Sequence, residues 1–153
     1  DPHIRIARGM ASRNKDHKLL PIASTYHLFL PGLKGGGKMS SSDENSFIAM
    51  TDSPKEVEQK IKKYAFSGGA DTAEEHRKKG GNPDVDVSFQ YLKMFFEPDD
   101  AKLKKIEQDY RSGRLLTGEL KEYLIKKINA FLRDHQKRRE QTRKQAEKFI
   151  FKS

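Results

Sequence analysis

A lysine followed by hydroxyl-bearing residues is the most chemically suggestive segment of the sequence. Lys38-Met39-Ser40-Ser41-Ser42 follows residues 31–37, which hold too many glycines for a helix or a strand. A flexible lysine can act as a mobile point charge on a phosphate chain, and hydroxyls and loop amides donate to phosphate oxygens. The segment therefore predicts a mobile loop that closes over a nucleotide. Composition alone favours the alternative of a flexible linker.

Other side chains that could support catalysis or metal binding are few. The chain has no cysteine, which excludes disulfides, thiolate zinc sites and a cysteine nucleophile. Its five histidines include no His-x-x-x-His pair, so no metal site is predicted. Acidic residues such as Asp84 and Asp86 precede an expected helix, where we expect carboxylates to cap the helix and to favour its dipole.

The elements that position the loop are predicted to be mainly helical. Helical spacing predicts a short helix within residues 1–14, and β-rich residues predict an extended segment over residues 19–30. Beyond the loop, capping and glycine signals predict a series of helices. The first of these helices begins with a capping box at Ser53, and the second is capped by Asp71. Two more are expected over residues 86–96 and around residues 103–110, and a long last helix is capped by Thr117. Apolar stripes that include Phe95, Phe96 and Phe131 are expected to form the core.

Charge is concentrated at the carboxyl-terminal end of the chain. The 153 residues carry 31 Lys and Arg against 22 Asp and Glu, a net charge of +9. Residues 121–153 hold 11 basic and 4 acidic residues, a net of +7. Such a basic tail suits a polyanion such as RNA. Taken alone, the run Lys137-Arg138-Arg139 is better explained by a solvated helix end than by a contact with a polyanion.

The chain has no long apolar segment, and it does not begin with methionine. The longest apolar run is too short for a transmembrane helix or a signal peptide, so no membrane partner is expected. The first residue is Asp1, which suggests a fragment of a longer protein.

Residues 38–42 resemble the KMSKS signature of class I aminoacyl-tRNA synthetases, with Ser41 at the position that is commonly lysine. We call these five residues the signature loop. Their flanks, residues 30–33 and 42–46, resemble the surroundings of the motif in the tryptophan and tyrosine enzymes. Further segments are similar to eukaryotic and archaeal tryptophanyl-tRNA synthetases: residues 1–5, 65–69, 74–77, 80–82, 84–92, 110–113 and 115–121. The resemblance therefore covers nearly the whole chain in order.

The resemblance implies a mainly α fold in two parts. Residues 1–52 would be the end of a Rossmann-type α/β catalytic domain that carries the signature loop, and residues 53–153 a helical anticodon-binding bundle. The family's HIGH-like nucleotide motif has no counterpart in this sequence. The chain is therefore expected to be the carboxyl-terminal part of a cytoplasmic enzyme, homodimeric when complete, and inactive by itself.

The resemblance also implies the chemistry of the loop. Such enzymes join L-tryptophan to tRNA(Trp) with ATP, brought in with Mg²⁺, and release AMP and diphosphate without a tightly bound cofactor. Lys38 would stabilise the charge that develops on the phosphates. Ser40, Ser41 and Ser42 would contact phosphates or order the loop. The backbone around Met39 would border the adenine, and its thioether is expected to be a packing group.

By the same analogy, the anticodon would contact the loop between the first two helices of the helical domain, at Gly68, Gly69 and Asp71. Glycines allow close approach of a backbone, and a carboxylate such as Asp71 can accept from the exocyclic amine of cytosine. A competing interpretation makes Asp71 only a helix cap, and the two roles are compatible. Lys137, Arg138 and Arg139 are the candidate contacts to tRNA phosphates.

Two alternative functions are considered beside the tryptophan enzyme. The first is a fragment of a tyrosine–tRNA ligase, which shares the motif block but is less similar over residues 65–92. The second is a non-catalytic tRNA-binding or interaction module that kept the helical domain alone.

Overall fold

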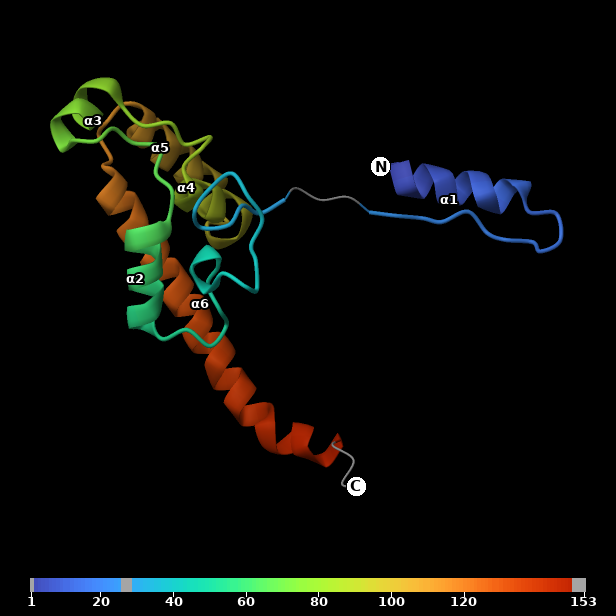
Figure 1. The fold of residues 1–153 in the computed structure, drawn as a ribbon. Helices are drawn as coiled ribbons and strands as arrows, with labels where there is room; N and C mark the ends of the chain where they lie inside the picture. The colour runs from blue at the N-terminus through green and yellow to red at the C-terminus, as the bar shows by residue number, and fades with distance from the viewer. Residues whose placement is uncertain (1, 26–28, 150–153) are drawn as a thin grey trace.

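The computed structural model describes residues 2–25 and 29–149 of the chain (Figure 1). Within these residues every regular element is a helix, as the mainly α prediction expected. In chain order they are α1 (Pro2–Arg13), η1 (Glu44–Ser46), α2 (Pro54–Tyr64), α3 (Ala73–Lys79), α4 (Val87–Tyr91), the π-helical η2 (Leu92–Phe96), α5 (Asp100–Arg111), α6 (Thr117–Ala146) and η3 (Glu147–Phe149).

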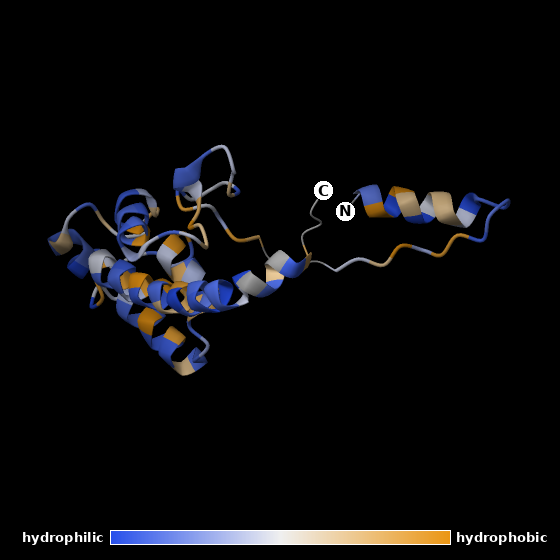
Figure 2. Ribbon diagram, turned by 90° about the horizontal axis from the view of Figure 1, so that it is seen from below, coloured by the Kyte–Doolittle hydropathy of each residue, from blue (hydrophilic) through white to orange (hydrophobic). Residues whose placement is uncertain are grey.

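The core lies between α6 and the shorter helices packed along it. Figure 1 shows α2 running beside the first half of α6, and the two helices are in contact. The core residues are Leu33, Val57, Ile61, Ala65, Val87, Phe89, Tyr91, Leu92, Tyr110, Leu120, Leu124, Ile125, Ile128 and Leu132. Figure 2 shows hydrophobic and hydrophilic segments alternating along the helices, as expected when each helix buries one side. Burial of these side chains is the main driving force for the fold.

Helix starts follow the sequence signals at α2 but not at α3. Ser53 and Glu56 form the predicted capping box at α2, where the Ser53 amide donates to the Glu56 carboxylate at 2.7 Å. At α3 the expectation that Asp71 caps the helix is wrong. The Thr72 hydroxyl accepts from the Glu75 amide at 3.2 Å, so Thr72 is the N-cap and Asp71 lies one residue outside the helix.

The start of α6 also differs from the prediction. Thr117 is the first helical residue, and its hydroxyl lies 3.1 Å from the Tyr110 hydroxyl. The amide of Leu116 instead donates to the Glu119 carboxylate at 2.7 Å. Thr117 therefore joins α6 to α5, and Glu119 satisfies the exposed amide at the helix start.

The helix expected over residues 86–96 changes type in its middle. After α4, the Glu97 amide bonds to the Leu92 carbonyl at 2.9 Å, which closes a wider π turn. This turn leaves Phe95 68% exposed, and Phe131 on α6 is 42% exposed. The expectation that both aromatic residues belong to the core is wrong. Phe95 lies in the π turn, which changes the helical register of its side chain. Phe131 lies on α6 at the edge of the core, where its ring is 5.9 Å from that of Phe96.

The amino-terminal segment lies to one side of the helical body (Figure 1). Helix α1 has no buried residue, and Arg8 of α1 donates from Nε to the Ile22 carbonyl at 2.8 Å. Residues 19–25 and 29–30 do not form a strand, because a strand needs a hydrogen-bonded neighbour and the described part of the chain supplies none. Residues 26–28 of the expected extended segment lie outside the described residues. No helix in the described residues is long and apolar enough to cross a membrane.

Candidate functional site

The glycine-rich turn before the signature loop is fixed at its base. The Gly32 amide donates to the Gly37 carbonyl at 2.8 Å and closes the turn. Gly35, with a φ of +73°, occupies the left-handed region that glycine tolerates best. Leu33 is fully buried, its amide donates to the Ser46 carbonyl at 2.8 Å, and its carbonyl accepts from the Phe66 amide at 2.7 Å. The turn therefore starts from the core of the helical body.

The signature loop carries one exposed cation and two hydroxyl groups that are hydrogen-bonded to each other. Lys38 is exposed, and its ammonium group makes no hydrogen bond or ion pair with the described residues. The hydroxyls of Ser40 and Ser42 lie 2.8 Å apart, and Ser41 is exposed. A free ammonium group beside hydroxyl donors is suited to the oxygens of a phosphate chain.

Met39 points the other way, into the helical body. It lines an apolar groove of about 440 Å³ with Phe96, Ile128 and Leu132, among other residues. It also packs against the core cluster. The expectation that its thioether is a packing group is therefore confirmed, and the groove holds the loop against η2 and α6.

Ser46 lies outside the signature loop but binds its backbone, and the motif did not single this residue out. It is buried, and its hydroxyl accepts from the Ser40 amide at 2.9 Å. The same hydroxyl lies 2.7 Å from the Asp43 carbonyl and 3.1 Å from the Ser40 carbonyl, to which it donates. Serine favours such local hydrogen bonds to backbone groups, but no sequence pattern indicated which backbone groups this serine would bind.

An ion pair links the turn before the loop to the residue after it. The Lys34 ammonium group lies 2.6 Å from the Asp43 carboxylate, and this hydrogen bond lowers the pKa of Asp43. Asp43 also caps η1 by accepting from the Asn45 amide at 3.2 Å. Lys34 further lies 5.9 Å from the centre of the Tyr64 ring on α2. Through Lys34, the segments on both sides of the signature loop are thus connected to α2.

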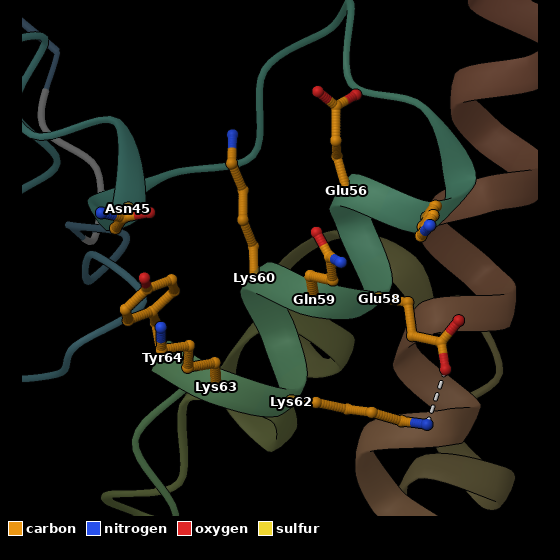
Figure 3. A pocket seen from close by; sticks show the side chains of 9 residues that line it. Asn45, Glu56, Glu58, Gln59, Lys60, Lys62, Lys63 and Tyr64 are labelled. Atoms are coloured by element: carbon orange, nitrogen blue, oxygen red, sulfur yellow. Dashed lines mark hydrogen bonds and ion pairs between the residues drawn. The ribbon is translucent and has the colours of Figure 1, made fainter.

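A basic hollow of about 700 Å³ lies on the neighbouring face of α2. Figure 3 shows Lys60 and Tyr64 on the side of α2 that faces Asn45, and the ion pair between Lys62 and Glu58. That pair has a length of 2.6 Å, and Lys60 lies 2.7 Å from the carboxylate of Asp52. Because Lys60 and Lys62 are already paired with carboxylates, these two lysines are weaker candidates for phosphate binding than Lys38.

The loop before α3 holds its two glycines against the chain itself. The Gly68 amide donates to the Asp86 carboxylate at 2.9 Å, and a Cβ on Gly68 would lie 1.9 Å from the Asn82 carbonyl oxygen. A Cβ on Gly69 would lie 2.2 Å from the Thr117 hydroxyl. Each glycine therefore allows close approach of another part of the protein, a backbone carbonyl at Gly68 and a side-chain hydroxyl at Gly69.

Asp71 is exposed at the end of that loop, next to the cap residue Thr72. With Thr72, His76, Thr117 and other residues it lines a hollow of about 410 Å³ between the starts of α3 and α6. Glu119 and Glu122 add carboxylates to the same hollow. Carboxylates repel phosphates and accept hydrogen bonds from base amines, so this surface is suited to bases rather than to a nucleic-acid backbone.

A buried polar network holds this loop in place. Asp86 is fully buried and accepts from the Tyr110 hydroxyl at 2.7 Å, from the Ser88 amide at 2.9 Å and from Gly68 as described above. Burial raises the pKa of Tyr110. The Nε2 atom of His76 lies 3.0 Å from the Leu115 carbonyl, and its ring lies 5.0 Å from the Tyr110 ring. The prediction that Asp86 caps α4 is confirmed, whereas its contacts with Tyr110 and Gly68 could not be foreseen from spacing.

The basic residues Lys137, Arg138 and Arg139 are exposed near the end of α6. About 21 residues separate Thr117 from Arg138, and at 1.5 Å per residue they lie roughly 30 Å apart along the helix. Figure 1 shows α3 beside the start of α6, far from the carboxyl-terminal end of that helix. The structure therefore does not bring the basic run and the Asp71 loop together, although one long ligand could contact both.

Comparison with known proteins places these features in a family. The family model described as tRNA synthetases class I (W and Y) matches residues 1–133. The chain is 59% identical over 145 residues to the tryptophan–tRNA ligase of Sulfurisphaera tokodaii, covering 94% of this chain and 37% of that protein. It is 50% identical over 142 residues to the cytoplasmic tryptophan–tRNA ligase of Homo sapiens, covering 92% of this chain and 29% of that protein.

A solved structure agrees with the sequence comparisons. The tryptophanyl-tRNA synthetase of the hyperthermophilic archaeon Aeropyrum pernix K1 is similar with a TM-score of 0.87 and 39% identity, over 99% of this chain and 41% of that one. The chain thus spans less than half the length of these relatives. Because the family model matches most of its residues, the chain belongs to the class I tRNA synthetases of the tryptophan and tyrosine type.

Proposed function

We propose that this chain is the carboxyl-terminal part of a tryptophan–tRNA ligase, which joins L-tryptophan to tRNA(Trp) with ATP. The observation that carries the proposal is the exposed Lys38, whose ammonium group has no partner among the described residues, on a loop whose two sides are fixed to the protein. Relatives at 50–59% identity support tryptophan rather than tyrosine as the amino acid. We take residues 1–52 as the end of the catalytic domain and residues 53–153 as the helical tRNA-binding domain.

In the proposed reaction the tryptophan carboxylate attacks the α-phosphorus of ATP. The bond to the β-phosphate oxygen breaks, and pyrophosphate leaves with the electron pair of that bond. Negative charge therefore moves onto pyrophosphate in the transition state, where the Lys38 ammonium group stabilises it. Ser40, Ser41 and Ser42 offer hydroxyl donors to the same phosphates, and Mg²⁺ enters with ATP as part of the substrate.

In the second step a ribose hydroxyl of the tRNA attacks the carbonyl carbon of the adenylate. AMP leaves, and the amino acid becomes an ester of the terminal adenosine. No enzyme side chain forms a covalent bond, so catalysis depends on positioning and on charge stabilisation. A loop fixed at both sides limits where Lys38 can lie relative to the phosphates, which suits this task.

We further propose that the helical part binds the tRNA at two places. Asp71 accepts a hydrogen bond from an anticodon base, while Gly68 and Gly69 shape the loop that carries it. Lys137, Arg138 and Arg139 contact phosphates without reading sequence. The acidic hollow around Asp71 and the basic end of α6 support this division of roles.

The complete protein is proposed to be cytoplasmic, by analogy with the cytoplasmic relative named above. We also propose that it is a homodimer, as the family resemblance of the sequence implies. The chain alone is proposed to be inactive, because the HIGH-like nucleotide motif is not among its residues. Tryptophan-dependent ATP–pyrophosphate exchange by the complete protein tests the proposal. Exchange with tryptophan and none with tyrosine supports it, whereas exchange with tyrosine alone, or none with either amino acid, contradicts it.

A further inference from the structure

We propose that Ser46 is a positioning residue for Lys38, fixing the carboxyl-terminal side of the signature loop through its buried hydroxyl. The proposal rests on the proposed function of the loop. Ser46 lies outside residues 38–42 and would touch neither substrate, so its effect would be exerted through the loop backbone.

The contacts of the Ser46 hydroxyl converge on the residue next to Met39. The oxygen accepts from the Ser40 amide at 2.9 Å. Its proton is shared between the carbonyls of Asp43 at 2.7 Å and Ser40 at 3.1 Å. Ser46 is only 5% exposed, so water does not readily replace these bonds.

The other side of the loop is fixed independently. The Gly37 carbonyl accepts from the Gly32 amide at 2.8 Å, so the backbone is held immediately before Lys38 and again at Ser40. Lys38 and Met39 alone lie between these two fixed points. The Met39 side chain is seated in the apolar groove. The remaining freedom is therefore mainly that of the Lys38 side chain.

Ser46 also joins the loop to the helical body. Its backbone carbonyl accepts from the Leu33 amide at 2.8 Å, and the Leu33 carbonyl accepts from the Phe66 amide at 2.7 Å. Leu33 is fully buried in the core. The Ser46 hydroxyl is thus the last contact in a short series of hydrogen bonds that runs from the end of α2 to the signature loop.

The first test measures amide hydrogen exchange in the 153-residue chain. Ser46→Ala should speed exchange of the Ser40 amide by about three- to tenfold, as expected when one hydrogen bond is lost. Ser112→Ala is the matched control, because Ser112 is an exposed serine on α5's carboxyl end whose hydroxyl donates to a backbone carbonyl at 3.2 Å. Unchanged Ser40 exchange in Ser46→Ala would overturn the proposal.

The second test measures pyrophosphate exchange by the complete enzyme. Ser46→Ala should lower kcat by about ten- to a hundredfold with little change in KM for tryptophan, because a misplaced charge slows chemistry more than it weakens binding of the amino acid. Ser46→Thr, which keeps the hydroxyl, should restore most of the lost kcat. Ser112→Ala should match the wild type.

The outcomes separate this inference from the proposed function. If the wild-type enzyme lacks tryptophan-dependent exchange, the proposed function fails whatever Ser46 does. If the wild type is active and Ser46→Ala has the kcat of Ser112→Ala, the positioning role is overturned. A lowered melting temperature with kcat unchanged in the folded enzyme would also overturn it, since Ser46 would then be purely structural.

Discussion

The Tyr110 hydroxyl donates a hydrogen bond of 2.7 Å to the Asp86 carboxylate, and both residues are fully buried. This contact joins the end of α5 to the start of α4. Asp86 also accepts from the Gly68 amide at 2.9 Å, so the same carboxylate fixes the loop that carries Asp71. The shape of a proposed RNA-reading loop thus depends on a buried carboxylate that would never touch RNA.

Removing the Tyr110 hydroxyl should destabilise the helical body. Tyr110→Phe is expected to lower the free energy of unfolding by about 1–3 kcal/mol, because a buried charged acceptor loses one of its donors. Urea denaturation followed by circular dichroism measures the change. Tyr64→Phe is the control, since the Tyr64 hydroxyl has no hydrogen bond among the described residues. Equal stability of the two variants would show that the Asp86 bond contributes nothing net.

Glu97 should make stability depend on acid pH. Its carboxylate is 3% exposed, accepts from the Tyr123 hydroxyl, and lies 3.0 Å from the Lys127 ammonium group. These contacts, the Tyr123 hydrogen bond first, lower the pKa of Glu97 to about 2. Because the folded pKa lies below the unfolded value, the stabilisation is complete above about pH 5 and is lost as the pH falls toward 2.

Glu97→Gln tests this pH dependence. At pH 7 the variant should be less stable than the wild type by on the order of 1–3 kcal/mol, and the two should converge as the pH approaches 2. Thermal unfolding at a series of pH values measures the difference. A stability difference that is constant from pH 7 to pH 2 would mean that the charge of Glu97 is not the cause.

Sequence reasoning succeeded where one local signal decided the structure. The capping box at Ser53 and the cap at Asp86 are local patterns, and both are present in the fold. At α3, Asp71 and Thr72 are both good caps, and in the fold the Thr72 hydroxyl is the one that accepts from the Glu75 amide. Intrinsic preference could not separate two such neighbours.

The parts that were missed depend on contacts between distant residues. The π turn at η2 exposes Phe95, although its spacing is that of a buried helical stripe. The motif identified the signature loop but not Ser46, whose hydroxyl is important because Ser40 and Asp43 fold back onto it. Neither feature has a sequence period that would reveal it.

Lys38→Ala in the complete enzyme should slow adenylate formation far more than it weakens tryptophan binding. The ammonium group is needed chiefly when charge moves to pyrophosphate, so the activation free energy should rise by about 2–4 kcal/mol. Pyrophosphate exchange kinetics measure the rate, and equilibrium tryptophan binding is the control. An unchanged exchange rate would remove Lys38 from the proposed mechanism.

The basic end of α6 should contribute affinity without specificity. Changing Arg138 and Arg139 together to Ala should weaken binding of every tRNA alike, because both guanidinium groups are exposed and far from the Asp71 loop. The slope of log affinity against log salt should become shallower by about one to two units. Binding measured over a range of salt concentrations tests this. Selective loss of tRNA(Trp) binding would contradict a role in phosphate contact alone.

Asp71 should contribute specificity without affecting the salt slope. Asp71→Ala removes the carboxylate oxygens that would accept a hydrogen bond from a base. If Asp71 accepts a hydrogen bond from a cytosine amine, the variant should lose about 1–3 kcal/mol of preference for a tRNA with the tryptophan anticodon over one without it. Because Asp71 is exposed and is not the helix cap, the melting temperature of the variant should stay close to that of the wild type.

Thr72→Ala supplies the matched control for Asp71, because Thr72 is the residue that caps α3. Loss of that cap should cost roughly 1 kcal/mol of stability. If Asp71→Ala lowers anticodon preference at unchanged stability, and Thr72→Ala lowers stability but keeps the preference, then Asp71 reads the base and Thr72 caps the helix. If discrimination is the same in Asp71→Ala and the wild type, Asp71 does not read the anticodon. The reading groups would then have to lie elsewhere on the helical body, and Glu122, which lines the same hollow, would be the next residue to change.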